Sequence, residues 1–89
     1  MPSKDEPLTP NHLDEIVARH KAATAGPWTS FVEGRDHTSG SSFIRTGGDD
    51  IELSGATDAD QDFIAHARQD IPRLLAEVER LRALLKEPK

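Results

Sequence analysis

Residues that could do chemistry gather in the polar stretch GRDHTSGSS, residues 34–42. It places Arg35, Asp36 and His37 beside several hydroxyl groups, and an acid, a base and a hydroxyl together are the groups of hydrolase chemistry. The spacing contains no nucleophile elbow, and loops are polar by default because they face water. We therefore expect an ordinary surface loop, and we assign no catalytic residue and no enzymatic activity to it.

The same region also holds groups that would suit a small anionic ligand. Arg35 and Arg45 could flank an anion, and Trp28 could offer a face on which a nucleotide base stacks. The stretch TGGDD, residues 46–50, is not a phosphate loop, because it lacks Gly-Lys-Ser/Thr and precedes a strand. A ligand site of Trp28, Arg35, His37 and Arg45 is therefore an alternative to a structural role for Trp28 as a lid over a thin core.

Histidines and acids raise the question of a metal site. Asp62, His66 and Asp70 are spaced four residues apart, and His12 and His20 share another predicted helix. A histidine and an aspartate at such spacing can bind zinc. No His-x-Glu or His-x-x-Glu signature accompanies them, and acids in a first helical turn commonly complement the helix dipole. We expect no metal and no cofactor.

The elements that position these residues belong to one small domain of 89 residues. The net charge of −5 makes nucleic acid an unfavourable partner, since phosphate contacts require a basic surface. No run approaches 18 apolar residues and no leader opens the chain, so we expect a cytoplasmic protein without membrane contact. Without cysteine, so small a core depends on tight helix packing or on self-association.

The first element expected is a helix over about residues 9–24, after a flexible tail at residues 1–7. Thr9 can cap it and Pro10 suits its first position. Gly26 is expected to end it in the left-handed conformation. Its narrow apolar stripe comprises Leu13, Ile16, Val17 and His20.

Residues 28–54 carry strand signals. WTSFV, SFIRT and IEL are rich in β-branched and aromatic residues or alternate apolar with acidic ones, and glycine-containing polar stretches separate them. We predict a three-stranded antiparallel meander packed by two helices. Residues 8–89 would form a single α+β domain of order α-β-β-β-α.

A long helix is predicted over about residues 58–86, capped by Thr57 or Asp58. Pro72 lacks the amide that would bond to residue 68, which predicts a kink or a break there. The apolar seam stays in register across it and favours one kinked helix. That seam comprises Phe63, Ala67, Ile71, Leu74, Val78, Leu81 and Leu85, widened by Leu75 and Leu84.

Two arrangements of this helix remain open. It could pack on its own sheet and first helix, which would use Phe63, Ile64, Ala67 and Ile71. Its C-terminal half could instead pair, parallel or antiparallel, with a second copy or with a partner helix. Because the leucines outnumber what one short helix and three short strands can cover, we predict a homo-oligomer, most simply a dimer. Its predicted interface is Ile71, Leu74, Leu75, Val78, Leu81 and Leu85.

Two segments also carry a family resemblance. LDEIVARHKAATAGPW, residues 13–28, followed by residues 58–85, resembles short phage and prophage proteins of the Ead-like type. The matching residues, over roughly half of the chain, are Ala23, Thr24, Gly26, Pro27, Trp28, Asp62, Phe63, Ile64, Ala65 and Leu74 to Arg82. The resemblance does not extend over residues 33–56, and it carries no catalytic residue over.

The resemblance implies an accessory protein of a phage or mobile element. We expect it to act by protein–protein interaction with a host or element protein, through its acidic surface and strand loops. The alternative is a protein that binds or sequesters a small nucleotide-type ligand at the site named above.

Overall fold

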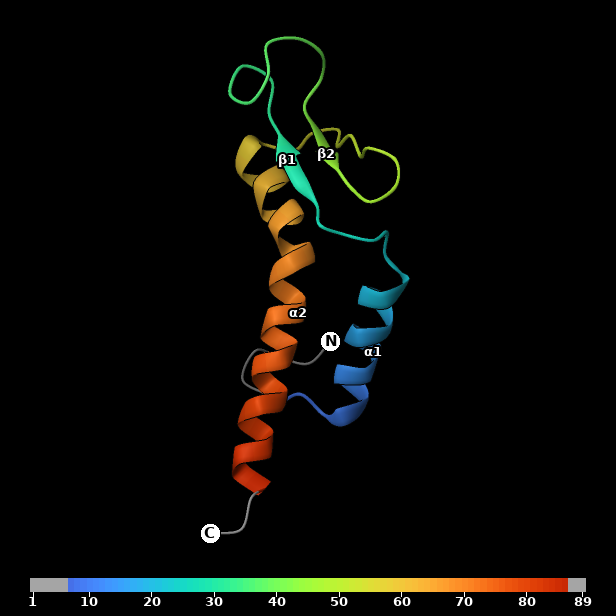
Figure 1. Ribbon diagram of the computed structural model, residues 1–89, viewed down its shortest axis with the longest axis vertical. Helices are drawn as coiled ribbons and strands as arrows, with labels where there is room; N and C mark the ends of the chain where they lie inside the picture. Colours follow the sequence, from blue (N-terminus) through green and yellow to red (C-terminus); the bar gives the residue numbers. More distant parts are fainter. Residues whose placement is uncertain (1–6, 87–89) are drawn as a thin grey trace.

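The computed structural model describes residues 7–86, so the tail expected at residues 1–7 lies outside the described part except for Pro7. Within that range the chain has an α+β fold of two helices and two strands: α1 (Pro10–Ala22), β1 (Thr29–Phe31), β2 (Phe43–Arg45) and α2 (Asp58–Lys86). Figure 1 shows α2 as the axis of an elongated molecule. The strands lie beside the N-terminal end of α2, and α1 lies beside its C-terminal half.

The start of α1 is confirmed, but its end is not where the sequence placed it. The backbone N–H of His12 donates to Thr9 Oγ1, and the Thr9 N–H donates to His12 Nδ1, both at 3.2 Å, with Pro10 following the cap. The helix ends at Ala22, and Ala23 is extended with its N–H bonded to the Arg19 carbonyl. The expected left-handed Gly26 is therefore wrong, because the chain has already left the helix to cross toward α2.

The sheet differs from the predicted meander. β1 and β2 pair antiparallel, with Thr29 opposite Arg45 and Phe31 opposite Phe43. The expected third strand is reduced to Ile51, which exchanges two backbone hydrogen bonds with Ile44 at 2.8 and 2.9 Å. A tight turn explains this: Thr46 Oγ1 donates to the Asp49 carbonyl and accepts from the Gly48 N–H. The chain returns beside β2 for a single residue and then departs toward α2.

The core of the described residues is small and lies between the sheet and the first turns of α2. Its buried apolar side chains are Val32, Ile44 and Ala65, joined by the amide of Gln61, which is only 4% exposed. Phe63, which the sequence assigned to packing on the sheet, is 75% exposed. The reason is helical phase: positions 61 and 65 share the face that meets the sheet, and position 63 points away from it.

α2 is one helix of 29 residues that runs through Pro72 without a break. Its length is about 44 Å. Thr57 caps it: Thr57 Oγ1 accepts from the Asp60 N–H at 3.0 Å, while Asp60 Oδ2 accepts from the Thr57 N–H at 3.1 Å. Neither α1 nor α2, the helices of residues 7–86, combines the length and apolar character needed to cross a bilayer.

Candidate functional site

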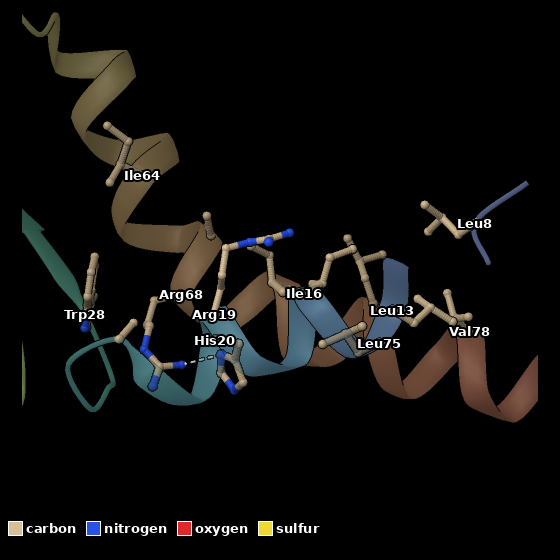
Figure 2. Close-up of a pocket in the computed structure, with 14 residues that line it drawn as sticks. Leu8, Leu13, Ile16, Arg19, His20, Trp28, Ile64, Arg68, Leu75 and Val78 are labelled. Carbon is tan, nitrogen blue, oxygen red and sulfur yellow. Dashed lines mark hydrogen bonds between the residues drawn. The ribbon is translucent and has the colours of Figure 1, made fainter. Parts of the chain in front are cut away.

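An apolar groove of about 560 Å³ lies between α1 and α2 (Figure 2). Its walls carry branched aliphatic side chains from both helices, including Leu13, Ile16, Ile64, Ile71, Leu75 and Val78. The groove exists because α1 touches α2 without closing on it: none of the residues of α1 is buried. A surface of this composition is suited to receive another apolar surface rather than to do polar chemistry.

Trp28 stands at one end of this groove and is held there through its backbone. Its N–H donates to Gln69 Oε1 at 2.7 Å, and Gln69 Nε2 donates back to the Trp28 carbonyl at 3.1 Å. The indole N–H donates to the Thr24 carbonyl at 3.0 Å. The sequence indicated that Trp28 would cover the core. The half-buried ring lines the groove instead.

The linker before Trp28 is fixed from a second side. The Gly47 N–H donates to the Ala25 carbonyl at 2.8 Å. A Cβ atom on residue 47 would lie 2.7 Å from that oxygen, so this approach requires glycine. The TGGDD stretch, residues 46–50, thus helps to hold the linker between α1 and β1 in place.

A cationic group borders the groove near Trp28. Arg68 Nε donates to the Thr24 carbonyl at 3.0 Å, and Arg68 Nη1 lies 2.8 Å from His20 Nδ1. Because an arginine can only donate, His20 Nδ1 is the acceptor in this contact. Within residues 7–86 Arg68 forms no ion pair with a carboxylate.

The leucines of α2 are largely exposed. Leu74 is 64% exposed and Leu85 is 86% exposed, while Ile71 and Leu81 are also exposed. Leu75 and Val78 are half-covered by α1. Leu84, which the sequence grouped with the seam, is 52% exposed. At 3.6 residues per turn it lies half a turn from Leu75 but only about 60° from Leu81, so it is at the edge of the same face.

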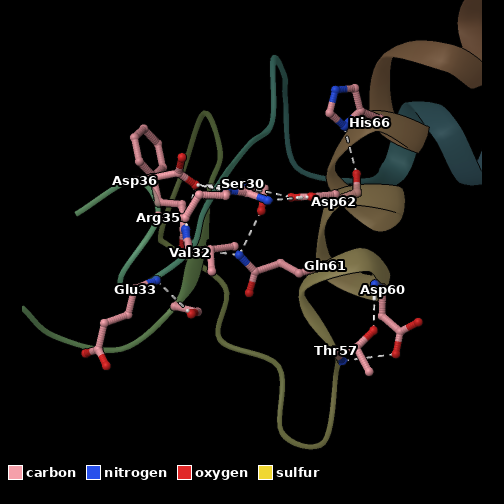
Figure 3. A network of polar contacts seen from close by, with 12 residues as sticks. Ser30, Val32, Glu33, Arg35, Asp36, Thr57, Asp60, Gln61, Asp62 and His66 are labelled. Atoms are coloured by element: carbon pink, nitrogen blue, oxygen red, sulfur yellow. Dashed lines mark hydrogen bonds and ion pairs between the residues drawn. The ribbon is translucent and has the colours of Figure 1, made fainter. Parts of the chain in front are cut away.

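A polar cluster joins the loop after β1 to the start of α2 (Figure 3). Arg35 donates to both carboxylate oxygens of Asp62, at 2.8 and 2.9 Å, and through Nε and Nη2 to Asp36. The bonds to Asp62 and then Asp36 raise the pKa of Arg35. The bond from Arg35, followed by one from Ser30, holds the pKa of Asp62 well below its ordinary 3.8. The bonds from Arg35 and from the Val32 backbone lower the pKa of Asp36.

The four residues of the predicted ligand site are anchored separately. Arg35 is occupied by Asp62, whereas Trp28 is bound to Gln69, seven residues further along α2, or about 10 Å. His37 Nδ1 bonds to the Ser39 carbonyl at 2.7 Å, and its ring lies tilted against Phe43. Arg45 stacks over the ring of Phe31 at 4.8 Å. These contacts give each side chain a structural partner.

The residues weighed for a metal are also engaged elsewhere. His66 Nδ1 bonds to the Asp62 carbonyl at 2.8 Å, and the Asp62 carboxylate holds Arg35. Across residues 7–86, no three side chains of histidine, aspartate or glutamate gather as a metal site would require.

The sequence patterns did not reveal the face of α2 that contacts the sheet and the linker. Gln61 Nε2 lies 2.8 Å from Ser30 Oγ and 3.2 Å from the carbonyl oxygens of Phe31 and Phe43, and Gln69 holds Trp28. With Ala65 between them, the two glutamines form a stripe at intervals of four residues. That spacing is the signal that could have revealed a second contact face.

Comparisons with protein-family models, with curated proteins and with solved structures give no match to this chain.

Proposed function

We propose that this protein is an interaction protein that self-associates through the apolar face of α2, most simply as a homodimer. The interface would consist of Ile71, Leu74, Leu75, Val78, Leu81 and Leu85. The observation that carries the proposal is the exposure of Leu74 and Leu85, 64% and 86%, on a helix face whose neighbour α1 leaves a groove open. Contiguous apolar surface of this kind marks sites of association.

Other apolar residues of the same face support this proposal. Ile71 is 39% exposed and Leu81 is 46% exposed. Covering apolar area stabilises an assembly by about 25 cal/mol per Å², before the cost of association.

We further propose that the protein is a cytoplasmic accessory protein of a phage or mobile element, which binds a host or element protein. This rests on the Ala-Thr-x-Gly-Pro-Trp segment ending at Trp28 and on the Leu-rich helix. The partner would meet the loop of residues 34–42, which stands at the sheet end of α2 (Figure 1). A nucleotide-type site is not proposed, because two carboxylates occupy Arg35.

Sedimentation equilibrium tests the self-association. We expect the wild-type chain to have twice its monomer mass and the double variant Leu74→Glu, Leu85→Glu to be monomeric. Ala76→Glu is the matched control, because Ala76 is exposed and lies about 160° around α2 from Leu74 and half a turn from Leu85, and it should remain dimeric. A wild-type chain that stays monomeric at millimolar concentration would refute the proposal.

The binding of a partner protein needs a separate experiment. Host lysate is passed over the immobilised wild-type protein and over a variant in which residues 34–42 are replaced by a short glycine-serine turn. Loss of a retained protein on the variant would assign the contact to that loop. Identical retained proteins on both would exclude it.

A further inference from the structure

We infer that two copies pair with their α2 helices antiparallel, about a two-fold axis that crosses α2 between Leu74 and Leu75. The α2 helix of each copy then fills the groove between α1 and α2 of the other. The inference rests on the proposed self-association and adds its orientation, its register and the residues that meet.

The apolar face of α2 is self-complementary about that axis. Residues at equal distance from the midpoint become neighbours, as in any isologous interface. Leu74 then meets Leu75, Ile71 meets Val78, and Ile64 meets Leu85. The aliphatic stem of Arg68 lies opposite Leu81, while its guanidinium stays bound to the Thr24 carbonyl and His20.

The charges along α2 also favour the antiparallel orientation. The half of α2 before Pro72 carries four aspartates and one arginine, a net charge of −3. The half after Pro72 carries four basic and two acidic residues, a net charge of +2. These are Arg73, Arg80, Arg82 and Lys86, and Glu77 and Glu79. An antiparallel pair sets the acidic half of each helix against the basic half of the other. A parallel pair would place like charges side by side.

The extent of the groove favours the same orientation. It continues past the end of α1 to Ile64 and Trp28, beside the acidic half of α2 (Figure 2). Only an antiparallel partner brings the most exposed leucine, Leu85, to that end. The same arrangement lays Ala67 and Ile71 of the second copy near Leu13 and Ile16 of α1. The result is a bundle of four helices with the sheets at its two ends.

Disulfide cross-linking tests the orientation, and the natural chain contains no cysteine that could interfere. Leu74→Cys, close to the axis, should cross-link to itself in either orientation and so reports pairing through this face. Leu85→Cys alone should not cross-link, because antiparallel pairing separates the two sulfurs by about 32 Å of helix, whereas a disulfide needs Cα atoms within about 7 Å. A mixture of Leu85→Cys and Ile64→Cys should give about tenfold more disulfide dimer than either variant alone. Ala76→Cys, which is exposed and lies half a turn around α2 from Leu85, is the negative control.

The outcomes separate the two proposals. A monomeric wild-type chain with no cross-link at Leu74→Cys refutes the self-association itself. Cross-linking of Leu74→Cys together with self-cross-linking of Leu85→Cys shows a parallel pair, which overturns the inference and leaves the dimer standing. Cross-linking of Leu74→Cys without any product in the mixture overturns the register.

Discussion

The side-chain amide of Gln69 binds both backbone groups of Trp28, accepting from its N–H at 2.7 Å and donating to its carbonyl at 3.1 Å. The two residues lie 41 positions apart. This pairing ties the linker between α1 and β1 to the middle of α2. It therefore helps to fix the position of α1 relative to α2 and the end of the groove at Trp28.

Replacement of Gln69 by leucine should destabilise the protein, because it removes both bonds and leaves the Trp28 backbone without these partners. The expected loss in free energy of unfolding is about 1–3 kcal/mol. Urea unfolding followed by the fluorescence of Trp28, the single tryptophan, measures it directly. Asp70→Asn, an exposed change at the next position, is the control and should have little effect; equal stabilities for Gln69→Leu and wild type would contradict the role of the amide.

Gln61→Glu should make the folding stability of the protein increase as the pH falls from 7 toward 5. A carboxylate at this buried position would face the carbonyl oxygens of Phe31 and Phe43 and could donate to neither, so the protonated form is favoured in the folded state. A folded-state pKa above the unfolded value means that the variant becomes more stable as the pH falls from 7 toward 5. Gln61→Leu should be destabilised without this pH dependence. Denaturation midpoints at the two pH values distinguish them.

The Arg35 cluster predicts a loss of stability in acid. The lowered pKa values of Asp36 and Asp62 mean that their contribution is fully present above the ordinary value of 3.8 and is lost as the pH falls below it. In Arg35→Met the contribution is absent, so the difference in urea midpoint between wild type and variant should shrink between about pH 5 and pH 2. Because these groups are exposed, added salt should also reduce the difference at neutral pH. A gap that stays constant over this range would show that the ion pairs do not stabilise the fold.

Ile44→Ala should be the most damaging single truncation of the sheet end. Ile44 is the largest fully buried side chain among the described residues, and few others are available to fill the space it leaves. We expect a loss of about 2–4 kcal/mol in the free energy of unfolding. Leu84→Ala, which truncates an exposed side chain, should change it by less than about 0.5 kcal/mol. Comparable losses in the two variants would mean that the core does not lie where the burial places it.

The sequence predicted those features that depend on neighbours along the chain. Thr9 and Pro10 signalled the start of α1 because capping is local. The segments around Phe31 and Phe43 signalled strands because side-chain shape alone favours them. The third strand failed at Ile51, where the turn closed by Thr46 leaves room for only one pair of backbone bonds.

The site needed the structure because its contacts join distant positions. Arg35 reaches Asp62 across 27 residues, and Gln61 reaches Ser30 across 31. No periodicity reports such pairs. The leucines were visible as a seam, but their spacing did not show that α1 partly covers Leu75 while Leu74 and Leu85 stay exposed.

The placement of the sheet at one end of a continuous helix has a consequence for recognition. In an antiparallel pair, the two copies of the 34–42 loop point to opposite ends of a rigid rod, more than about 40 Å apart. A single target molecule with one binding spot would then engage only one loop. A filament, a ring or any array that repeats the spot at the matching interval would engage both and be held far more firmly by avidity.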